Sequence, residues 1–326
     1  MKSFKIGNIR IKNPVFLAPM VDVTDLAYRM LCRKWIGMAY TEMLYVDAIL
    51  HDTENRKFPA PSTSIKEVAG NSKTKRLMKT CKEDKPVGLQ ITGNSLKELK
   101  KFSKLKLLKN YNLVDINCGC PSSRITGNLA GSYLLNNPNK IAEMIKILKK
   151  DNTVTAKIRL GFRKNNVLKV AKLIEKSGAS ALTIHARLAK DRYDAPADWK
   201  WIKKIKKEIG IPIIGNGDIS SGEDVEKMLD ICDGAMVARA SIGNPLIFRE
   251  IQRYLKTGKE KEIRKEDRIN EFKKYLKFAK RYKLIDLGRI KFLGGNFLRG
   301  FEGAGSMRKG LMKLKTLDEF ERFLEE

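Results

Sequence analysis

Short runs of β-branched and other apolar residues alternate along the chain with longer segments in which apolar positions recur every three or four residues. Runs of the first kind predict buried strands at 15–18, 38–41, 87–91, 114–117, 154–158, 181–185, 211–215 and 235–238. Most neighbouring runs are roughly 23 to 30 residues apart, which is the length of one strand–helix unit. Eight such units in succession predict an α/β fold, a closed parallel (β/α)8 barrel of the TIM type.

The segments between these runs carry the start signals of helices. Thr24, Ser95 and Ser221 precede helices predicted at 25–34, 96–108 and 223–229, and Pro138 opens a helix predicted at 139–150. Within this last segment Ile141, Ile145 and Leu148 recur at a helical spacing. They predict a face that packs on the sheet.

The pattern changes after residue 255. Residues 256–267 form a charged linker, and the chain beyond it shows helical periodicity without a strand signal. The stretch 268–299 holds ten Lys or Arg and two acidic residues, together with a predicted buried stripe of Ile269, Phe272, Leu276 and Ala279. Glycines of this region predict turns between short helices, at Gly294, Gly295, Gly300, Gly303 and Gly305. We therefore expect a catalytic barrel domain at 1–250 and a smaller, basic all-α domain at 256–326.

The charge of the chain points to its partner. Its 326 residues include 66 Lys and Arg against 37 Asp and Glu, a formal net charge of +29. Such an excess favours a polyanion such as RNA; a Lys-rich composition without a dedicated partner is the alternative. No apolar run reaches the roughly 18 residues of a membrane span, and the run that begins at Val15 is too short for a secretion signal. We expect a cytoplasmic protein that does not bind a membrane.

The cysteines and histidines predict neither disulfides nor a structural metal. Five cysteines are few and odd in number, which indicates free thiols in a reducing compartment. Cys118 and Cys120 are too close together for a CxxC zinc site, and the only histidines are His51 and His185. We expect a monomer without a bound metal.

Polar and special residues lie just beyond the predicted strands, where a parallel barrel forms its reactive face. Seven of the eight strands contribute, with Ala18-Pro19-Met20, Gln90, Asn117-Cys118-Gly119-Cys120-Pro121, Lys157 with Arg159, His185-Ala186-Arg187, Asn216-Gly217-Asp218 and Ala238-Arg239. This set resembles the tRNA-dihydrouridine synthase family, flavin enzymes that reduce the uracil C5–C6 bond in tRNA. The residues that carry the resemblance are the family's Asn-x-Gly-Cys-Pro signature at 117–121 and the motifs APM at 18–20, LQITG at 89–93, AKIRLG at 156–161, IHAR at 184–187 and NGDI at 216–219.

The resemblance covers essentially the whole chain and implies a set of site residues. It implies that Pro19, Met20 and Val21 border a flavin ring and that Gln90 and Lys157 hydrogen-bond to it. It implies further that the flavin or its phosphate tail is held by His185, Asn216, Gly217, Asp218, Ala238 and Arg239. The family usually has Gly-Arg at 238–239, so the extra methyl of Ala238 can crowd the approach of a phosphate to the backbone.

The residues themselves agree with this chemistry. Reduction of uracil requires a hydride at C6 and a proton at C5, and Cys120 suits the acid because a cysteine thiol is ordinarily protonated at neutral pH. Cys118 is expected to be structural, since neighbouring alternate positions of an extended chain cannot both lie over one ring atom. Gly215, Gly217 and Gly243 are expected to give the backbone the freedom to approach phosphate.

Each remaining polar residue has an alternative role. Lys157 faces an anionic flavin locus or pairs with Glu42 or Asp115, and His185 contacts the cofactor or is a core imidazole. For substrate binding, Asn117 contacts the uracil edge or makes an internal turn bond, and Arg187 contacts uracil or RNA phosphate or forms an ion pair. Asp218 is expected to shape a loop or to accept from a ribityl hydroxyl.

The leading interpretation is therefore an FMN-dependent tRNA-dihydrouridine synthase that uses NAD(P)H and binds tRNA through its basic helical domain. A small-molecule pyrimidine oxidoreductase of the dihydroorotate dehydrogenase type is one alternative, although it would need neither the charge nor the helical appendage. An RNA-binding protein on a relict barrel without catalysis is the other.

Overall fold

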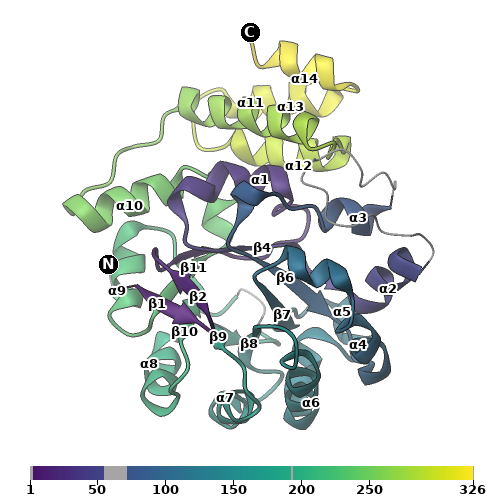
Figure 1. The fold of residues 1–326 in the computed structure, drawn as a ribbon. Helices are drawn as coiled ribbons and strands as arrows, with labels where there is room; N and C mark the ends of the chain where they lie inside the picture. Colours follow the sequence, from purple (N-terminus) through teal and green to yellow (C-terminus); the bar gives the residue numbers. More distant parts are fainter. Residues whose placement is uncertain (1–2, 55–71, 192–193, 326) are drawn as a thin grey trace.

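A parallel barrel forms the larger part of the molecule (Figure 1). The structure is a computed structural model and describes residues 3–54, 72–191 and 194–325. Neighbouring strands pair in parallel, and Leu17 N–H donates to the carbonyl of Met38 at 3.1 Å, which closes the ring. The barrel strands are β3 (Val15–Leu17), β4 (Ala39–Tyr40), β5 (Leu44–Tyr45), β6 (Val87–Thr92), β7 (Leu113–Cys118), β8 (Val154–Gly161), β9 (Ala181–Leu188), β10 (Ile213–Asn216) and β11 (Gly234–Val237).

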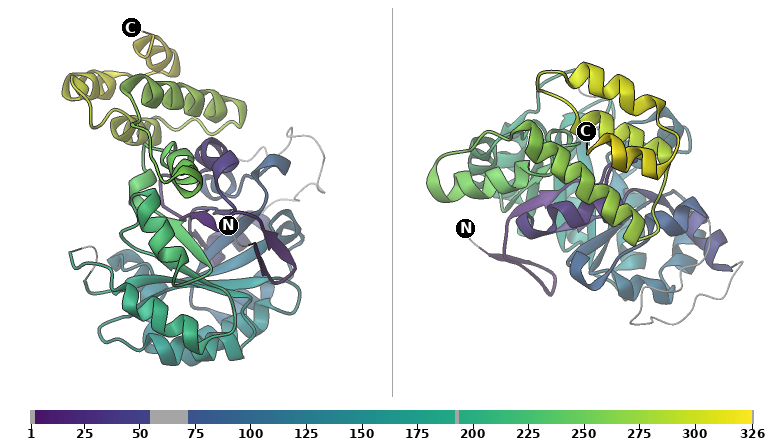
Figure 2. Two further views of the ribbon diagram at one scale, coloured as in Figure 1. Left: turned by 90° about the vertical axis from the view of Figure 1, so that its left-hand side faces the viewer. Right: turned by 90° about the horizontal axis from the view of Figure 1, so that it is seen from above.

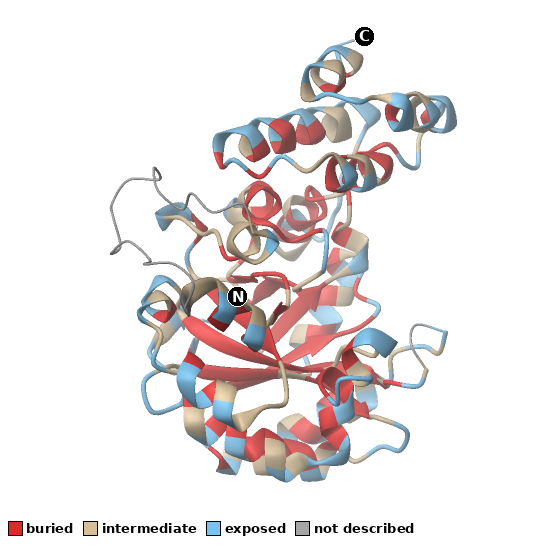
Figure 3. Ribbon diagram, turned by 90° about the vertical axis from the view of Figure 1, so that its right-hand side faces the viewer, coloured by how far each residue is buried: buried red, intermediate tan, exposed pale blue. Residues whose placement is uncertain are grey.

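The predicted (β/α)8 barrel is confirmed, with one strand divided. Where the sequence predicts a single strand at 38–41, two short strands, β4 and β5, pair one after the other with β6. Their side chains and those of the other strands are almost uniformly buried (Figure 3). Burial on both faces explains why the strands appear in the sequence as continuous apolar runs.

An antiparallel hairpin that the sequence pattern does not predict precedes the barrel. It consists of β1 (Phe4–Ile6) and β2 (Ile9–Ile11), joined through Gly7 at a φ of 58°. Ile6 and Ile11 are buried in a small core of their own against Phe16 and Leu113 at the amino ends of the strands. The hairpin thus covers this end of the barrel, and the functional site lies at the other.

Helices surround the barrel and expose their outer faces (Figure 3). They are α1 (Leu26–Cys32), α2 (Val46–Glu54), α3 (Lys73–Leu77), α4 (Leu96–Phe102), α5 (Ser123–Thr126), α6 (Pro138–Leu148), α7 (Val167–Lys176), α8 (Trp199–Glu208), α9 (Gly222–Leu229) and α10 (Ile247–Thr257). Ser95 and Ser221 cap α4 and α9 as predicted, and the predicted stripe of α6 is buried. Within the described part of the chain, no helix is long and apolar enough to span a membrane.

The limits of the predicted helices differ in detail from the structure, most clearly at two places. Asp25 rather than Thr24 caps α1, because the Asp25 carboxylate accepts from Tyr28 N–H while the Thr24 hydroxyl bonds to Met20. The helix predicted at 96–108 ends at Phe102, and a separate turn of 3-10 helix follows at 106–110.

The C-terminal part is all-α, as predicted. It comprises α11 (Lys265–Arg281), α12 (Leu287–Phe297), α13 (Ala304–Lys313) and α14 (Leu317–Phe323), which together we call the helical region. Gly258, at a φ of 69°, ends α10, so the linker spans 258–264 and is shorter than predicted. The division into domains at 1–250 and 256–326 stays a prediction, because α10 crosses it.

Three of the glycines predicted as turns lie inside helices. Gly294 and Gly295 belong to α12 and Gly305 to α13, whereas Gly300 and Gly303 have positive φ angles in the turn between these helices. A Cβ on Gly294 would lie 2.6 Å from the ring of Phe272. Close helix packing, which local sequence does not reveal, therefore explains this glycine.

The helical region stands on one side of the barrel, next to α1 and α10 (Figure 2). Aromatic rings fill the junction: Phe297 of α12 lies 5.2 Å from Phe272 and 6.2 Å from Tyr28 of α1, between ring centroids. Tyr28 also donates its hydroxyl proton to the carbonyl of Ser241. The aromatic side chains at this junction are buried and in contact with one another, as in a hydrophobic core.

Candidate active site

A cavity of about 600 Å³ opens at the carboxyl ends of the barrel strands. Every site residue predicted from the sequence lines it, except Arg187: Pro19, Met20, Val21, Gln90, Asn117, Cys120, Lys157, His185, Asn216, Gly217, Asp218, Ala238 and Arg239. The carboxyl-terminal parts of separate strands and the loops that follow them therefore bring these residues together. The cavity volume lies within the range of about 300–1,000 Å³ that small-molecule and cofactor sites occupy.

The loop after β7 presents Cys120 to the cavity. The Asn117 side-chain oxygen accepts the backbone N–H groups of Gly119 at 3.1 Å and Cys120 at 2.9 Å. The carbonyl of Cys120 in turn accepts from the N–H of Ser132 at 3.0 Å. The loop is therefore held on both sides of Cys120, whose side chain is partly exposed.

Cys118 occupies a different environment two residues earlier. It has no exposed surface and belongs to the main core, where burial raises the pKa of its thiol far above the ordinary value. Its position agrees with the structural role expected of it.

A buried polar network underlies the cavity between β6, β7 and β8. The Gln90 amide accepts from Asn117 at 2.8 Å and donates to Asp115 at 2.7 Å, and Thr155 donates to the other Asp115 oxygen at 2.6 Å. Desolvation raises the pKa of Asp115 to about 6, and the two hydrogen bonds act against this rise. Asn117 makes the internal turn bonds to Gly119 and Cys120. The side-chain amides of Asn117 and Gln90 also join the neighbouring strands β7 and β6.

Lys157 projects from β8 into the cavity and donates to an amide oxygen rather than to Glu42 or Asp115. Its ammonium group donates to the side-chain oxygen of Asn216 at 2.8 Å, and Asn216 donates to the carbonyl of Met236 at 2.8 Å. Desolvation, and then the nearby charge of Arg159, lowers the pKa of Lys157 from 10.5 to about 8. The cavity therefore holds a cation that lacks a carboxylate partner within salt-bridge distance in the described chain.

Arg159 is a cavity residue that the predicted site leaves out. It donates to the carbonyl of Gly119 at 2.9 Å and to that of Leu188 at 2.9 Å, and its side chain is buried. It thus joins the end of β9 to the loop that carries Cys120. The sequence shows that Arg159 follows Lys157 at an alternate position of the same strand. It does not show that Arg159 binds the carbonyl groups of Gly119 and Leu188.

His185 is neutral in this site. Burial, followed by the charges of Lys157, Arg159, Arg187 and Arg239, lowers its pKa far below the ordinary value. The guanidinium of Arg187 lies 3.2 Å from His185 Nε2, and because an arginine only donates, Nε2 accepts and Nδ1 carries the proton. His185 therefore presents a fixed tautomer.

Arg187 lies behind the cavity wall and holds Asp218. Its guanidinium donates to both Asp218 oxygens at 2.6 Å, and its side chain is 3% exposed. Asp218 also accepts from Ala197 N–H at 2.8 Å and from Arg239 at 3.1 Å. Burial acts to raise the Asp218 pKa, but these hydrogen bonds and cations leave it below its ordinary value. Asp218 thus shapes the loop, which is one of the two roles expected of it.

The glycines expected to admit a phosphate divide into two kinds. Gly217 and Gly243 have φ angles of 115° and 65°, so their loops depend on glycine. Gly215 has no such angle; a Cβ there would lie 2.1 Å from the sulfur of Met228, which makes it a packing position.

Comparisons with known proteins show which family the chain belongs to. A family model described as "Dihydrouridine synthase (Dus)" matches residues 16–326. The "Probable tRNA-dihydrouridine synthase" of Aquifex aeolicus is 35% identical over 251 residues, 74% of this chain and 73% of that protein. The "tRNA-dihydrouridine synthase B" of Pasteurella multocida is 33% identical over 255 residues, 76% of this chain and 71% of that protein. An old yellow enzyme homologue from Zymomonas mobilis shares the fold, with a TM-score of 0.52 at 13% identity over 82% of this chain and 95% of that one.

Proposed function

The chain belongs to the dihydrouridine synthase family, and from that membership we propose that it is a tRNA-dihydrouridine synthase that depends on FMN and NAD(P)H. It reduces the C5–C6 double bond of a uridine in tRNA to 5,6-dihydrouridine. The observation that carries the proposal is the Cys120 loop, which faces the same cavity as Lys157.

The cavity fits a flavin by its chemistry as well as by its volume. The Lys157 ammonium suits the N1–C2 locus of a reduced flavin, where negative charge develops. The Gln90 amide keeps one N–H beyond the one given to Asp115, so it can serve the same ring. Pro19, Met20 and Val21 would border the ring, and the loops at Asn216–Asp218 and 238–239 would hold the tail, with the exposed guanidinium of Arg239 near the phosphate.

A reduced flavin, when bound, supplies the hydride that uracil C6 requires. The residues of this chain donate the proton and position the donor. Cys120 donates its thiol proton to C5, and solvent restores that proton through the open cavity mouth. Asn117, whose oxygen holds the Cys120 backbone, acts mainly by positioning that thiol. A contact of Asn117 with the uracil remains part of the proposal, whereas Arg187, which lies behind the cavity wall, acts on the site through the loop of Asp218.

Net charge and family membership together favour tRNA as the substrate. A free-pyrimidine reductase, the first alternative, needs neither the net charge of +29 nor the helical region. The second alternative, a relict barrel, does not account for a partly exposed Cys120 that is held on both sides and shares its cavity with a half-buried cation. A cytoplasmic location and a monomeric state stay predictions.

The test is product formation by the purified protein. Incubated with FMN, NADPH and unmodified tRNA, the wild type should produce uridine with two added hydrogens, detected by mass spectrometry of the nucleosides. Cys120→Ala should bind flavin and tRNA normally and lose about 10²- to 10⁴-fold in rate, since only proton donation is removed.

Cys118→Ala is the matched control, because the two cysteines are two residues apart and only Cys120 reaches the cavity. Its rate per folded enzyme should stay near that of the wild type. Reversed results would show that the assignment of the acid is wrong, and absence of dihydrouridine with the wild type would refute the proposed reaction.

A further inference from the structure

Two large apolar side chains stand half exposed at the mouth of the cavity. Val21, on the loop after β3, is 52% exposed, and Phe292, on α12, is 46% exposed. Of the described residues that follow α10, Phe292 alone lines the cavity. The helical region thus contributes one side chain to the site, and that side chain is aromatic.

The packing of the helical region does not require Phe292. Its aromatic junction with the barrel is made by Phe297, Phe272, Tyr28 and Tyr275, which are all buried. Ile290, Leu293 and Phe297 form the inner face of α12, and Phe292 lies off this face. The ring of Phe292 therefore exposes apolar surface to water, and a ligand in the cavity would bury that surface.

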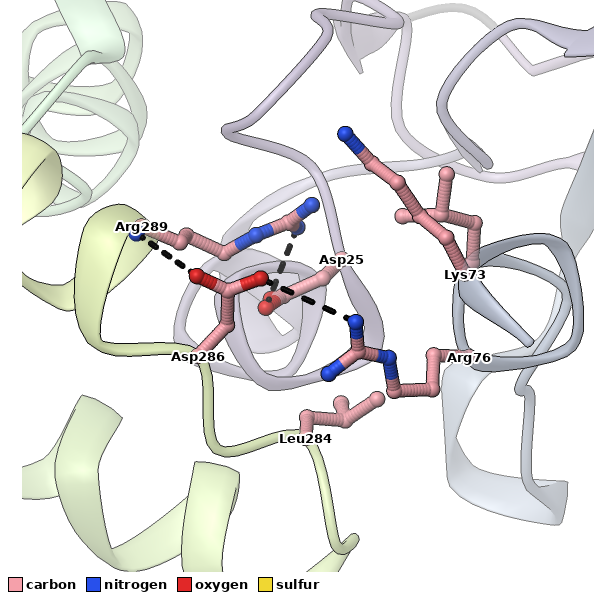
Figure 4. A pocket seen from close by; sticks show the side chains of 7 residues that line it. Asp25, Lys73, Arg76, Leu284, Asp286 and Arg289 are labelled. Atoms are coloured by element: carbon pink, nitrogen blue, oxygen red, sulfur yellow. Dashed lines mark hydrogen bonds and ion pairs between the residues drawn. The ribbon is translucent and has the colours of Figure 1, made fainter. Parts of the chain in front are cut away.

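The helix is fixed to the barrel on both sides of Phe292. One turn before it, Arg289 lies 3.3 Å from Asp25 and 3.7 Å from Asp22, and it also donates to Glu42. Figure 4 shows Arg289 and Asp25 at this end of α12, together with Asp286. One turn after Phe292, Gly243 of the barrel lies so close to α12 that a Cβ there would be 2.2 Å from the backbone of Asn296.

Phe292 and Val21 line the same cavity, from two elements that an ion pair joins. Asp22, the neighbour of Val21, pairs with Arg289, which is three residues from Phe292. An aromatic ring on a doubly anchored helix loses little conformational entropy when a ligand stacks on it. The ring therefore offers a preformed flat surface at the entrance of the cavity.

We propose that Phe292 is a substrate-contacting residue of the helical region and that its ring stacks on a nucleobase of the tRNA at the cavity mouth. The inference rests on the proposed function. A uridine that leaves its stack to enter the barrel loses stacking energy, and an aromatic side chain at the entrance replaces part of it for that base or the one beside it. A nucleobase suits the ring because each base has a π-face, whatever its hydrogen-bonding edge.

The test compares Phe292→Ala with the aromatic Phe292→Tyr and with Ile285→Ala. Ile285 is a matched control because it is 43% exposed in the helical region and does not line the cavity. The dissociation constant for tRNA, from fluorescence anisotropy with flavin-loaded protein, should rise about 5- to 150-fold for Phe292→Ala. It should stay within about 3-fold of the wild type for Phe292→Tyr, since the ring is kept. It should not change for Ile285→Ala.

Two further readouts separate the possible failures. Flavin content should match the wild type in all three variants, and a changed flavin content in Phe292→Ala would overturn the proposal, because the ring would then serve the cofactor. An unchanged dissociation constant in Phe292→Ala, or an equal loss in Phe292→Tyr, overturns the stacking. Failure of the proposed function is seen separately, as absence of dihydrouridine with the wild type.

Discussion

Lys157 should act in opposite directions on the stability of the flavin-free protein and on flavin binding. Its pKa falls from 10.5 to about 8, mainly through desolvation. That difference corresponds to about 3 kcal/mol by which the flavin-free fold disfavours the charged ammonium. The unfolded chain binds this proton more tightly than the folded one. The free energy of unfolding should therefore rise as the pH increases from 8 to 10.5.

The substitution Lys157→Met removes the half-buried charge and keeps the length of the side chain. At pH 7 the flavin-free variant should be more stable than the wild type by about 2 to 3 kcal/mol, because the loss of the hydrogen bond to Asn216 offsets only part of the gain. Its stability should also depend less on pH between 8 and 10. Flavin affinity at pH 7 should fall about 10- to 150-fold, the value of a hydrogen bond to a charged group.

Both quantities are measurable with the same preparations. Urea unfolding of flavin-stripped protein, followed by tryptophan fluorescence at pH 7 and pH 10, gives the stability, and quenching of FMN fluorescence gives the affinity. Lys169→Met, an exposed lysine of α7, is the control and should change neither. Loss of stability in Lys157→Met at pH 7 would show that the cation is satisfied by the fold itself. Unchanged flavin affinity would refute its role toward the cofactor.

The junction and the basic surface allow two more tests. Arg289→Met should destabilise the protein by about 3 to 5 kcal/mol at pH 7, because it leaves Asp25 and Glu42 buried without a cation. Burial already raises the pKa of Glu42, so protonation of Glu42 should shrink this loss as the pH falls toward 5. Arg76→Met is the control, because Arg76 and Asp286 form a partly exposed pair; urea unfolding should show a change below about 1 kcal/mol. Removing four exposed cations of α11 together should reduce the slope of log Kd for tRNA against log salt by about one for each phosphate that these cations neutralise, while flavin content stays constant. The four are Lys273, Lys277, Lys280 and Arg281. An unchanged slope would place the RNA footprint on the barrel rim instead, where Arg124 is exposed, Arg159 and Arg187 are buried, and Arg192 lies outside the described residues.

The sequence predicts most of the barrel and the residues that line its cavity, for a physical reason. In a parallel barrel every strand ends on the same rim, so residues such as Gln90, Cys120 and Asn216 meet whatever the loops between them do. Buried strands also leave a strong local signal, since both of their faces are apolar. The barrel could therefore be derived from the order of elements alone.

Features that depend on packing between distant segments could not be predicted in this way. Arg187 could be placed at a strand end, but its bidentate contact with Asp218 depends on a loop that holds Asp218 at a φ of 52°. Gly294 looked like a turn because nothing local shows that the Phe272 ring lies against it. Nothing in the sequence indicates that Phe292 lines the cavity, since a residue on the outer face of a helix in a basic stretch is ordinarily exposed to solvent.

The three carboxylates at the junction make the two parts of the chain one site. These carboxylates are Asp22, Asp25 and Glu42, and Arg289 of α12 pairs with all three. Glu42 also accepts the backbone N–H of Asp22 at 2.8 Å and so fixes the loop that presents Val21. Arg289 thus joins the loop that presents Val21 to the helix that carries Phe292. A barrel cut at residue 250 would keep Cys120 and Lys157, but it would lose Arg289, the cation that neutralises these carboxylates, and Phe292, which lines the cavity. The helical region therefore contributes to the candidate site as well as adding basic surface to it.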